Sequence, residues 1–438
     1  MTAFFTVIHM MKRKLYILFW VLIVLGTISC QRSRDGKEML FWSSNNSQEI
    51  AFTRQLIDDW NLAHPDKTIR HQPIPEGQSS EEIILAAVVG KTTPDIYANM
   101  MQGIVEMYAN AGVLVPLDTL DGFLDFIRER CSDEVIEEIT SADGHIYQVP
   151  WKVNPIITLY NVNVIESLQI EGLPDTYSKY LAAAKEIRQD RDGDGYIDQW
   201  IGNTSLKVIW YQRLFNFYPL YLAASHGGKL IENNKAAFNN EYAIGVFRFM
   251  QKLYQNNYFI RQRMEGTQDV FLKEMIFTQF TGAWQIRYLE KFKPDDLEFG
   301  FYQMLVPDDH QGPVYTYGDP KNLVLFNTCR DPQTAWEFIK TMISKEGDLE
   351  LLKVTGQFPR RMSLSDDEYF RDFLEANPKL QIFAEQVDYI KGLDNHELIV
   401  EVLDIISQEY EACVIYYKKT PEEAIAAAEK AVNVLLGK

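Results

Sequence analysis

Between residues 39 and 98 the chain alternates between strand and helix patterns, and this order leaves few folds open. The first helix pattern places Phe52, Leu56 and Trp60 at four-residue steps, with Asn46 or Ser47 positioned to cap it. The strand patterns lie at residues 39–42, 68–74 and 95–98. Because the links are short, strand, helix, strand, helix, strand predicts a parallel sheet with helices on both faces.

Polar and aromatic side chains follow two of these strands. In open sheets of this kind, ligands bind beyond the carboxyl ends of the strands. We therefore expect binding residues in the segments 42–46 and 95–99. The candidates are Trp42, Ser44, Asn45, Asn46 and Asp95.

The composition is that of a folded, acidic protein. Of 438 residues 46% are hydrophobic and 24% charged, and the formal net charge is −18. This is ample material for a core and unlike a disordered chain. Such a surface repels phosphate backbones and anionic headgroups, which excludes nucleic acid as a partner and any electrostatic adhesion to a membrane.

The N-terminus has the layout of a secretory signal. Lys12, Arg13 and Lys14 precede an apolar run from Leu15 to Ile28 that is too short to span a bilayer. Small residues and Cys30 follow, and this junction resembles a bacterial lipobox. We expect residues 1–29 to be removed and Cys30 to be acylated, which anchors the exported chain to the cell membrane. The alternative is ordinary cleavage with a free Cys30.

Three further cysteines stand far apart, at Cys131, Cys329 and Cys413. Their number is odd and they form no Cys-x-x-Cys pair. An exported chain could join two of them, but isolated buried thiols are the expectation.

Several short motifs follow one another in the order found in a known family. They are Asp-Trp-Asn and His-Pro within 59–65, Gly-Lys-Thr-Thr-Pro-Asp at 90–95, Gly-Val-Leu-Val-Pro-Leu-Asp at 112–118, Asp-Gly-His-Ile-Tyr-Gln-Val-Pro at 143–150, Tyr-Asn at 160–161, Pro-Asp-Thr-Tyr at 174–177, Gly-Ala-Trp at 282–284, Gly-Gln-Phe-Pro-Arg at 356–360 and Thr-Pro-Glu-Glu-Ala at 420–424. Together they resemble the family 1 type extracellular solute-binding proteins of bacterial ABC sugar importers.

The resemblance implies a two-lobed α/β fold of the periplasmic-binding-protein type. Each lobe would be a doubly wound, mostly parallel sheet with flanking helices, and the ligand cleft would lie between the lobes. We expect residues 30–150 to begin the N-terminal lobe and 151–300 to form the C-terminal lobe. Residues 301–438 would return to complete the first lobe and the hinge, with C-terminal helices packing across both lobes.

An acidic loop follows the calcium-loop pattern. Asp190, Asp192, Asp194 and Asp198 occupy its first, third, fifth and ninth places, and Gly195 its sixth. The twelfth place holds Ile201 instead of the bidentate Glu, so any calcium site would be weak. The alternative is a polar turn between a helix and a strand. No other cofactor is expected.

Aromatic side chains at the ends of elements are the main sequence clue to the ligand, because sugar faces stack on such rings. Core packing is the alternative for each ring, and a surface salt bridge is the alternative for each Arg. A neutral oligosaccharide is favoured over a uronate, which stays open. Besides the five residues named above, the candidates are Trp151, Asn154, Tyr160, Trp210, Trp284, Arg287, Tyr317, Asp319, Asn322 and Arg360.

Motifs of catalysis are missing from the sequence. It contains no Gly-x-Ser-x-Gly, no phosphate-binding Gly-x-x-x-x-Gly-Lys-Ser/Thr and no zinc helix. We expect a monomeric, non-enzymatic lipoprotein that captures a carbohydrate and delivers it to ABC permease subunits. The alternatives are a lipid-anchored polysaccharide hydrolase and an adaptor that presents its ligand to a sensor.

Overall fold

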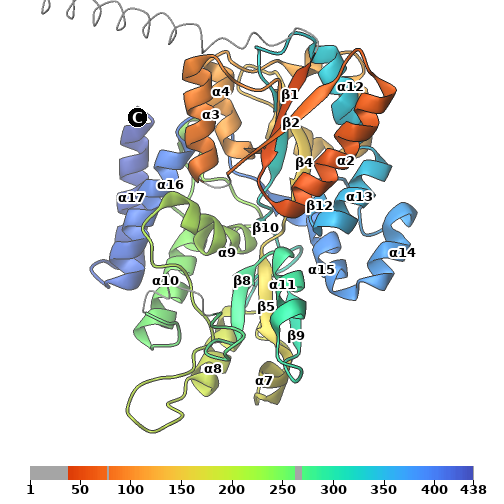
Figure 1. Ribbon diagram of the computed structural model, residues 1–438. Coiled ribbons are helices and arrows are strands. Elements are labelled where there is room, and N and C mark those ends of the chain that lie inside the picture. Colours follow the sequence, from red (N-terminus) through yellow and green to blue (C-terminus); the bar gives the residue numbers. More distant parts are fainter. Residues whose placement is uncertain (1–37, 76–77, 262–268, 438) are drawn as a thin grey trace, which may run out of the picture.

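The computed structural model describes residues 38–75, 78–261 and 269–437, so the signal segment and Cys30 lie outside the described residues. Two lobes are stacked one above the other, each built around its own sheet (Figure 1). The two-lobed α/β fold expected from the sequence is confirmed. Within the described residues, no helix is both long enough and apolar enough to cross a bilayer.

The first lobe contains a six-stranded sheet. Its strands, in spatial order, are β12 (Phe358–Pro359), β4 (Val149–Val153), β11 (Lys321–Leu325), β3 (Ile96–Met101), β1 (Met39–Ser44) and β2 (Ile69–Ile74). The pairs β1–β2 and β1–β3 are parallel, as the sequence predicted, whereas β11 runs antiparallel to both β3 and β4. Strand β12 also runs antiparallel to β4, so three of the five pairings are antiparallel and the expectation of mostly parallel pairing is wrong for this lobe. Both β11 and β12 come from the late return of the chain to this lobe.

The helices that link the parallel strands lie where the sequence placed them. Helix α2 (Ser47–Ala63) starts at Asn46, whose side-chain oxygen accepts hydrogen bonds from the backbone amides of Gln48 and Glu49. This cap satisfies two of the amide groups that a helix leaves unpaired at its N-terminus. Helix α3 (Gln78–Gly90) ends at Gly90, as expected. The remaining helices of this lobe and its flank are α4 (Val105–Asn110), α5 (Phe123–Arg130), α6 (Asp133–Ile139), α12 (Pro332–Met342), α13 (Lys345–Thr355), α14 (Glu368–Ala376) and α15 (Pro378–Gln386).

The second lobe contains a three-stranded sheet in the order β8 (Thr278–Thr281), β5 (Ile157–Asn161), β9 (Phe299–Tyr302). Both pairings are antiparallel, so the expectation of a mostly parallel sheet in this lobe is wrong. Among the described residues of this lobe, parallel pairing occurs only as isolated bridges, such as the one between Thr176 and Val306. The central strand β5 has on each side a strand that joins the sheet late in the chain order and runs against it, so no two strands of this sheet form a βαβ unit.

Helices make up most of the second lobe. They are α7 (Val162–Ser167), α8 (Tyr177–Ile187), η3 (Trp210–Phe215), α9 (Phe217–Ala224), α10 (Glu241–Gln255) and α11 (Trp284–Phe292), with the hairpin β6 (Ile231–Glu232) and β7 (Lys235–Ala236). The C-terminal helices α16 (Ile399–Tyr410) and α17 (Pro421–Leu435) lie beside α10 (Figure 1).

Two crossing segments lie side by side between the lobes. The chain leaves the first sheet after Val153 and comes back through β10 (Thr316–Tyr317) to β11. The backbone amide of Asn154 donates to Gly318 O at 2.7 Å, and that of Ile156 to Tyr317 O at 2.9 Å. Each crossing contains one proline, Pro155 and Pro320. Strand β13 (Ile390–Lys391) pairs with β10 and adds a third strand to this region.

Cys131, Cys329 and Cys413 are buried and form no disulfide among the described residues, which confirms the expectation of isolated thiols.

Candidate functional site

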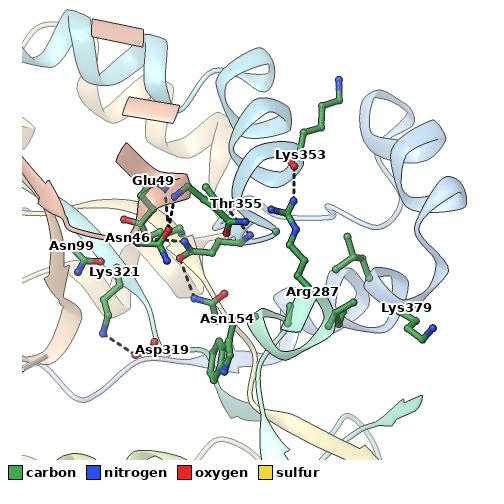
Figure 2. A pocket seen from close by; sticks show the side chains of 18 of the residues that line it. Asn46, Glu49, Asn99, Asn154, Arg287, Asp319, Lys321, Lys353, Thr355 and Lys379 are labelled. Carbon is green, nitrogen blue, oxygen red and sulfur yellow. Dashed lines mark hydrogen bonds and ion pairs between the residues drawn. The ribbon is translucent and has the colours of Figure 1, made fainter. Parts of the chain in front are cut away.

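A large cavity lies between the two lobes. Its volume is about 1070 Å³, at the upper end of the roughly 300–1,000 Å³ of small-molecule sites. The first lobe contributes the N-terminus of α2 and the ends of β3, β4 and β11, while η3 and α11 come from the second lobe. Helices α13, α14 and α15 close one side (Figure 2).

A buried ion pair forms one wall of the cavity. Lys152 on β4 donates to the carboxylate of Glu49 in the first turn of α2, and both side chains are almost fully buried. The same carboxylate accepts hydrogen bonds from Gln357 at 2.6 Å and from Ser44 at 2.7 Å. Figure 2 shows where Glu49 lies in the wall. Burial alone would raise the pKa of Glu49, but the charge of Lys152 and these hydrogen bonds outweigh it and lower the pKa. Glu49 therefore stays ionised inside the wall.

A second ion pair and strained backbone lie next to the first pair, because Lys321 on β11 is the register partner of Lys152 on β4. Lys321 donates to Asp319 at 2.8 Å. Asn99, in β3, has a φ of 111°, and Asp319 has a φ of 42°, values that L-residues rarely adopt. Burial raises the pKa of the neighbouring Glu81, although Lys321 opposes the shift. Lys321 thus offsets the charge of Asp319 and also acts on Glu81.

Aromatic rings line the side of the cavity formed by the second lobe. Trp284 is 43% exposed at the start of α11, and its ring lies 6.4 Å from that of Phe215 in an edge-on arrangement. A Cβ added at Gly282 would come within 2.1 Å of the Trp284 ring, so only glycine permits this ring position. The other aromatic residues of the lining are Trp210 and Tyr211 in the second lobe and Phe373 of α14 on the flank of the first lobe.

Arg287 connects the two lobes across the cavity. From α11 its guanidinium donates to the carbonyl oxygens of Lys353 and Val354, both at 2.7 Å, at the C-terminus of α13 (Figure 2). A cation is favoured there because the last carbonyls of a helix are unpaired and the dipole is negative at this end. Nearby, Lys379 of α15 pairs with Glu290 of α11 at 2.8 Å. These contacts hold α11 against the flank of the first lobe.

The structure brings part of the predicted site together. The predicted residues that line the cavity are Asn46, Asn154, Trp210, Trp284, Arg287 and Asp319. Those that do not line it are Trp42, Ser44, Asn45, Asp95, Trp151, Tyr160, Tyr317, Asn322 and Arg360.

Position within or next to the first sheet explains why several of the predicted residues do not line the cavity. Trp42, Trp151 and Asn322 sit on interior strands covered on both faces, so their side chains are buried. Asp95 lies at the amino end of β3, where it accepts a hydrogen bond from the backbone of Leu40 at 2.7 Å, far from the carboxyl end. Asn45 is exposed on the surface at the end of β1.

The other side chains that lie outside the lining have structural partners. Ser44 supports Glu49, and the hydroxyl of Tyr317 donates to Asp319, so these two act behind the cavity wall. Tyr160 packs against Tyr302. Arg360 pairs with Glu138 at 2.7 Å, as the salt-bridge alternative expected, but the pair is buried and does not lie at the surface.

Sequence reasoning missed Glu49 and its partners Lys152 and Gln357 in the cavity wall. Glu49 could have been found from its place in the first helical turn after a strand that points toward the ligand edge. Lys152 and Gln357 gave no comparable signal, because their proximity to Glu49 depends on β4 and β12 joining the first sheet late in the chain order.

The acidic loop lies in the second lobe, after α8. One carboxylate oxygen from each of Asp190, Asp192 and Asp194 falls within 4.8 Å of the others. Asp198 is outside that group, and its carboxylate accepts from the backbone amide of Arg191 at 2.8 Å. These carboxylates also accept hydrogen bonds from backbone amides of the loop, as in an ordinary polar turn. Calcium binding stays a prediction.

Comparison with solved structures identifies proteins of the same fold. An uncharacterised protein of Listeria monocytogenes EGD-e superposes with a TM-score of 0.79 at 24% identity, covering 91% of this chain and 100% of that one. The cyclic alpha-maltosyl-1,6-maltose binding protein of Arthrobacter globiformis gives 0.76 at 22% identity, with 91% and 98% covered. The maltose/maltodextrin-binding domain of Bdellovibrio bacteriovorus, bound to maltotriose, gives 0.69 at 17% identity, with 92% and 100% covered.

Comparison of sequences gives the family. No curated protein sequence matches the chain significantly. The model of the bacterial extracellular solute-binding proteins matches residues 55–381, well over half of the chain. The chain therefore belongs to the bacterial extracellular solute-binding protein family.

Proposed function

We propose that this solute-binding protein captures a neutral oligosaccharide in the cavity between its lobes. The observation that carries the proposal is the pairing of aromatic rings on one side, Trp284 and Phe215 among them, with polar side chains on the other. Members of the family bind solutes and are not enzymes. Two proteins of the same fold are named for maltose-type sugars, which supports a carbohydrate ligand.

The charges of the cavity favour a neutral ligand over a uronate. Among the described residues four carboxylates line it: Glu49, Asp319 and Glu290 are each paired with a lysine, and the charge of Lys321 also acts on Glu81. Aromatic contacts of about 0.5–1.5 kcal/mol each fall short of the roughly −8 kcal/mol of a micromolar ligand. Hydrogen bonds to sugar hydroxyls, at about 0.5–1.5 kcal/mol each, supply the remainder. Asn46, Asn99 and Asn154 are placed for this role.

Delivery follows from closure. A ligand that contacts both lobes binds the closed form more tightly than the open form, and this difference in affinity shifts the population toward the closed form. The permease then recognises the closed form. The protein acts as a monomer, held at the membrane through lipid on Cys30, which lies outside the described residues. Its acidic surface then keeps the lobes away from anionic headgroups.

Calorimetric titration with a panel of neutral oligosaccharides tests the proposal. We expect at least one linear glucose oligomer to bind with micromolar or tighter affinity and to be recovered intact. Release of reducing ends during incubation would instead support the hydrolase alternative. Binding of uronates alone would overturn the assignment of a neutral ligand.

A further inference from the structure

A second cavity lies on the far side of Trp284, within the second lobe. Its volume is about 430 Å³, and its walls come from the segment 203–207, η3, β8 and the first turn of α11. The rings of Trp284 and Phe215 line both this cavity and the one between the lobes. The two spaces are therefore neighbours that share an aromatic boundary.

The lining of the second cavity is rich in amides. The amide side chains are those of Asn203, Gln212, Asn216, Gln279 and Gln285. The chain has 61 acidic residues, yet none of the described residues that line this cavity is acidic, and Lys207 is the one charged residue among them. An amide offers both donors and an acceptor, which suits the hydroxyl groups of an uncharged sugar.

Three of these amides are available for a ligand. Within the part of the chain that the structure describes, no hydrogen bond joins the side chains of Gln212, Gln279 or Gln285 to another residue. Asn216 uses only its oxygen, which accepts from the backbone amide of Phe217 at 2.7 Å. Gln212 lies on η3, Gln279 on β8 and Gln285 on α11, so three separate elements present amides to one space.

We propose that the second cavity is an extension site for the same ligand. A linear, neutral oligosaccharide passes the Trp284 ring, with its first sugar units between the lobes and its later units bonded by Gln212 and Gln279. This inference rests on the proposed function and adds a requirement for chain length. Ligands too short to pass Trp284 bind only between the lobes.

The test measures how the effect of removing one amide side chain on affinity depends on the length of the ligand. Malto- and cello-oligosaccharides, from disaccharide to heptaose, are titrated calorimetrically into the full chain and into Gln279→Ala and Gln212→Glu. For the longest member that binds, we expect each variant to lower the affinity about tenfold, as expected for the loss of one or two hydrogen bonds. The affinity of the disaccharide should stay unchanged. Gln55→Ala, at an exposed amide of α2 that bonds Asp59, is the matched control.

The possible results separate the two proposals. Equal losses at every length, or no loss in either variant while the unmodified protein binds, would overturn the extension site and leave the proposed function intact. If no member of either series binds the unmodified protein, the proposed function fails and the extension site fails with it. Unfolding temperatures of the variants within a degree or so of the parent exclude a folding defect as the cause.

Discussion

The ammonium of Lys152 and the carboxylate of Glu49 meet inside the cavity wall, where β4 approaches the N-terminus of α2. The pair joins a strand that leads into the crossing segment to a helix that starts at the edge of the cavity. It therefore shapes the cavity and stabilises the first lobe at the same time.

Removing one partner of this pair should be costly. Lys152→Met leaves a buried carboxylate without its counter-charge, and we expect the free energy of unfolding to fall by about 3–5 kcal/mol. Adding Glu49→Leu should restore most of that loss. Urea unfolding measures both variants, with Arg248→Met, in an exposed pair with Glu422, as the control that changes by about 1 kcal/mol or less. A loss for Lys152→Met no larger than the control would contradict this account.

Trp284 should contribute to binding more than to folding. Because its ring is substantially exposed, Trp284→Ala should leave the unfolding temperature nearly unchanged while weakening saccharide binding by about 0.5–1.5 kcal/mol. Calorimetry measures the affinity, and Tyr196→Ala, at an exposed aromatic of the acidic loop, is the control. Unchanged affinity would remove Trp284 from the site.

Arg287 should bias the protein toward the arrangement described above. Arg287→Gln removes the charged group that donates hydrogen bonds to the C-terminus of α13. We expect the arrangement in which α11 contacts α13 to become less stable by about 1 kcal/mol, so that the lobes separate more readily. Small-angle scattering of the ligand-free variant should give a larger radius of gyration, which saccharide reverses. Arg371→Gln, in an exposed pair with Glu368, is the control. Identical scattering from the variant and the parent would show that Arg287 does not hold the lobes together.

Asp394 should make stability depend on pH. Burial raises the pKa of Asp394 to about 6 from 3.8, although the amides of Leu230 and Ile231 donate to its carboxylate. Between these values the folded state binds more protons than the unfolded state, so this group's contribution to stability falls as pH rises through 6. Asp394→Asn should therefore stabilise the protein by about 1–3 kcal/mol more at neutral pH than in mild acid. Denaturant curves at the two pH values measure this, and equal effects at both would refute it.

Calcium should stabilise the second lobe if the acidic loop binds it. We expect millimolar calcium to raise the unfolding temperature by a few degrees, in keeping with dissociation constants of about 10⁻⁴–10⁻³ M for weak sites. Asp192→Asn should abolish the shift, and magnesium is the ionic control. A chelator that leaves the unfolding temperature unchanged in calcium-containing buffer removes the metal prediction.

The N-terminal alternation could be read from the sequence because each element there is local and its neighbours follow directly. Helix α2 and its Asn46 cap illustrate this, since both depend on a few consecutive residues. The antiparallel β11 could not be predicted, because its pairing joins residues more than 200 positions apart. The same long-range assembly hid Lys152 and Gln357, whereas Trp284 was accessible through a compact motif. Aromatic residues on interior strands, such as Trp42, carried the same local signal as true lining residues.

The two prolines of the crossing segments limit how the lobes move. Pro155 and Pro320 each fix one backbone torsion, while hydrogen bonds from Asn154 and Ile156 tie the crossings into a ribbon. If the lobes close, the rotation must come from the few backbone torsions of the crossing segments that remain free. Only a small range of relative lobe orientations is then accessible. Because the relative motion of the lobes has little conformational entropy to lose on binding, less of the free energy of the ligand contacts is offset, and the affinity is higher.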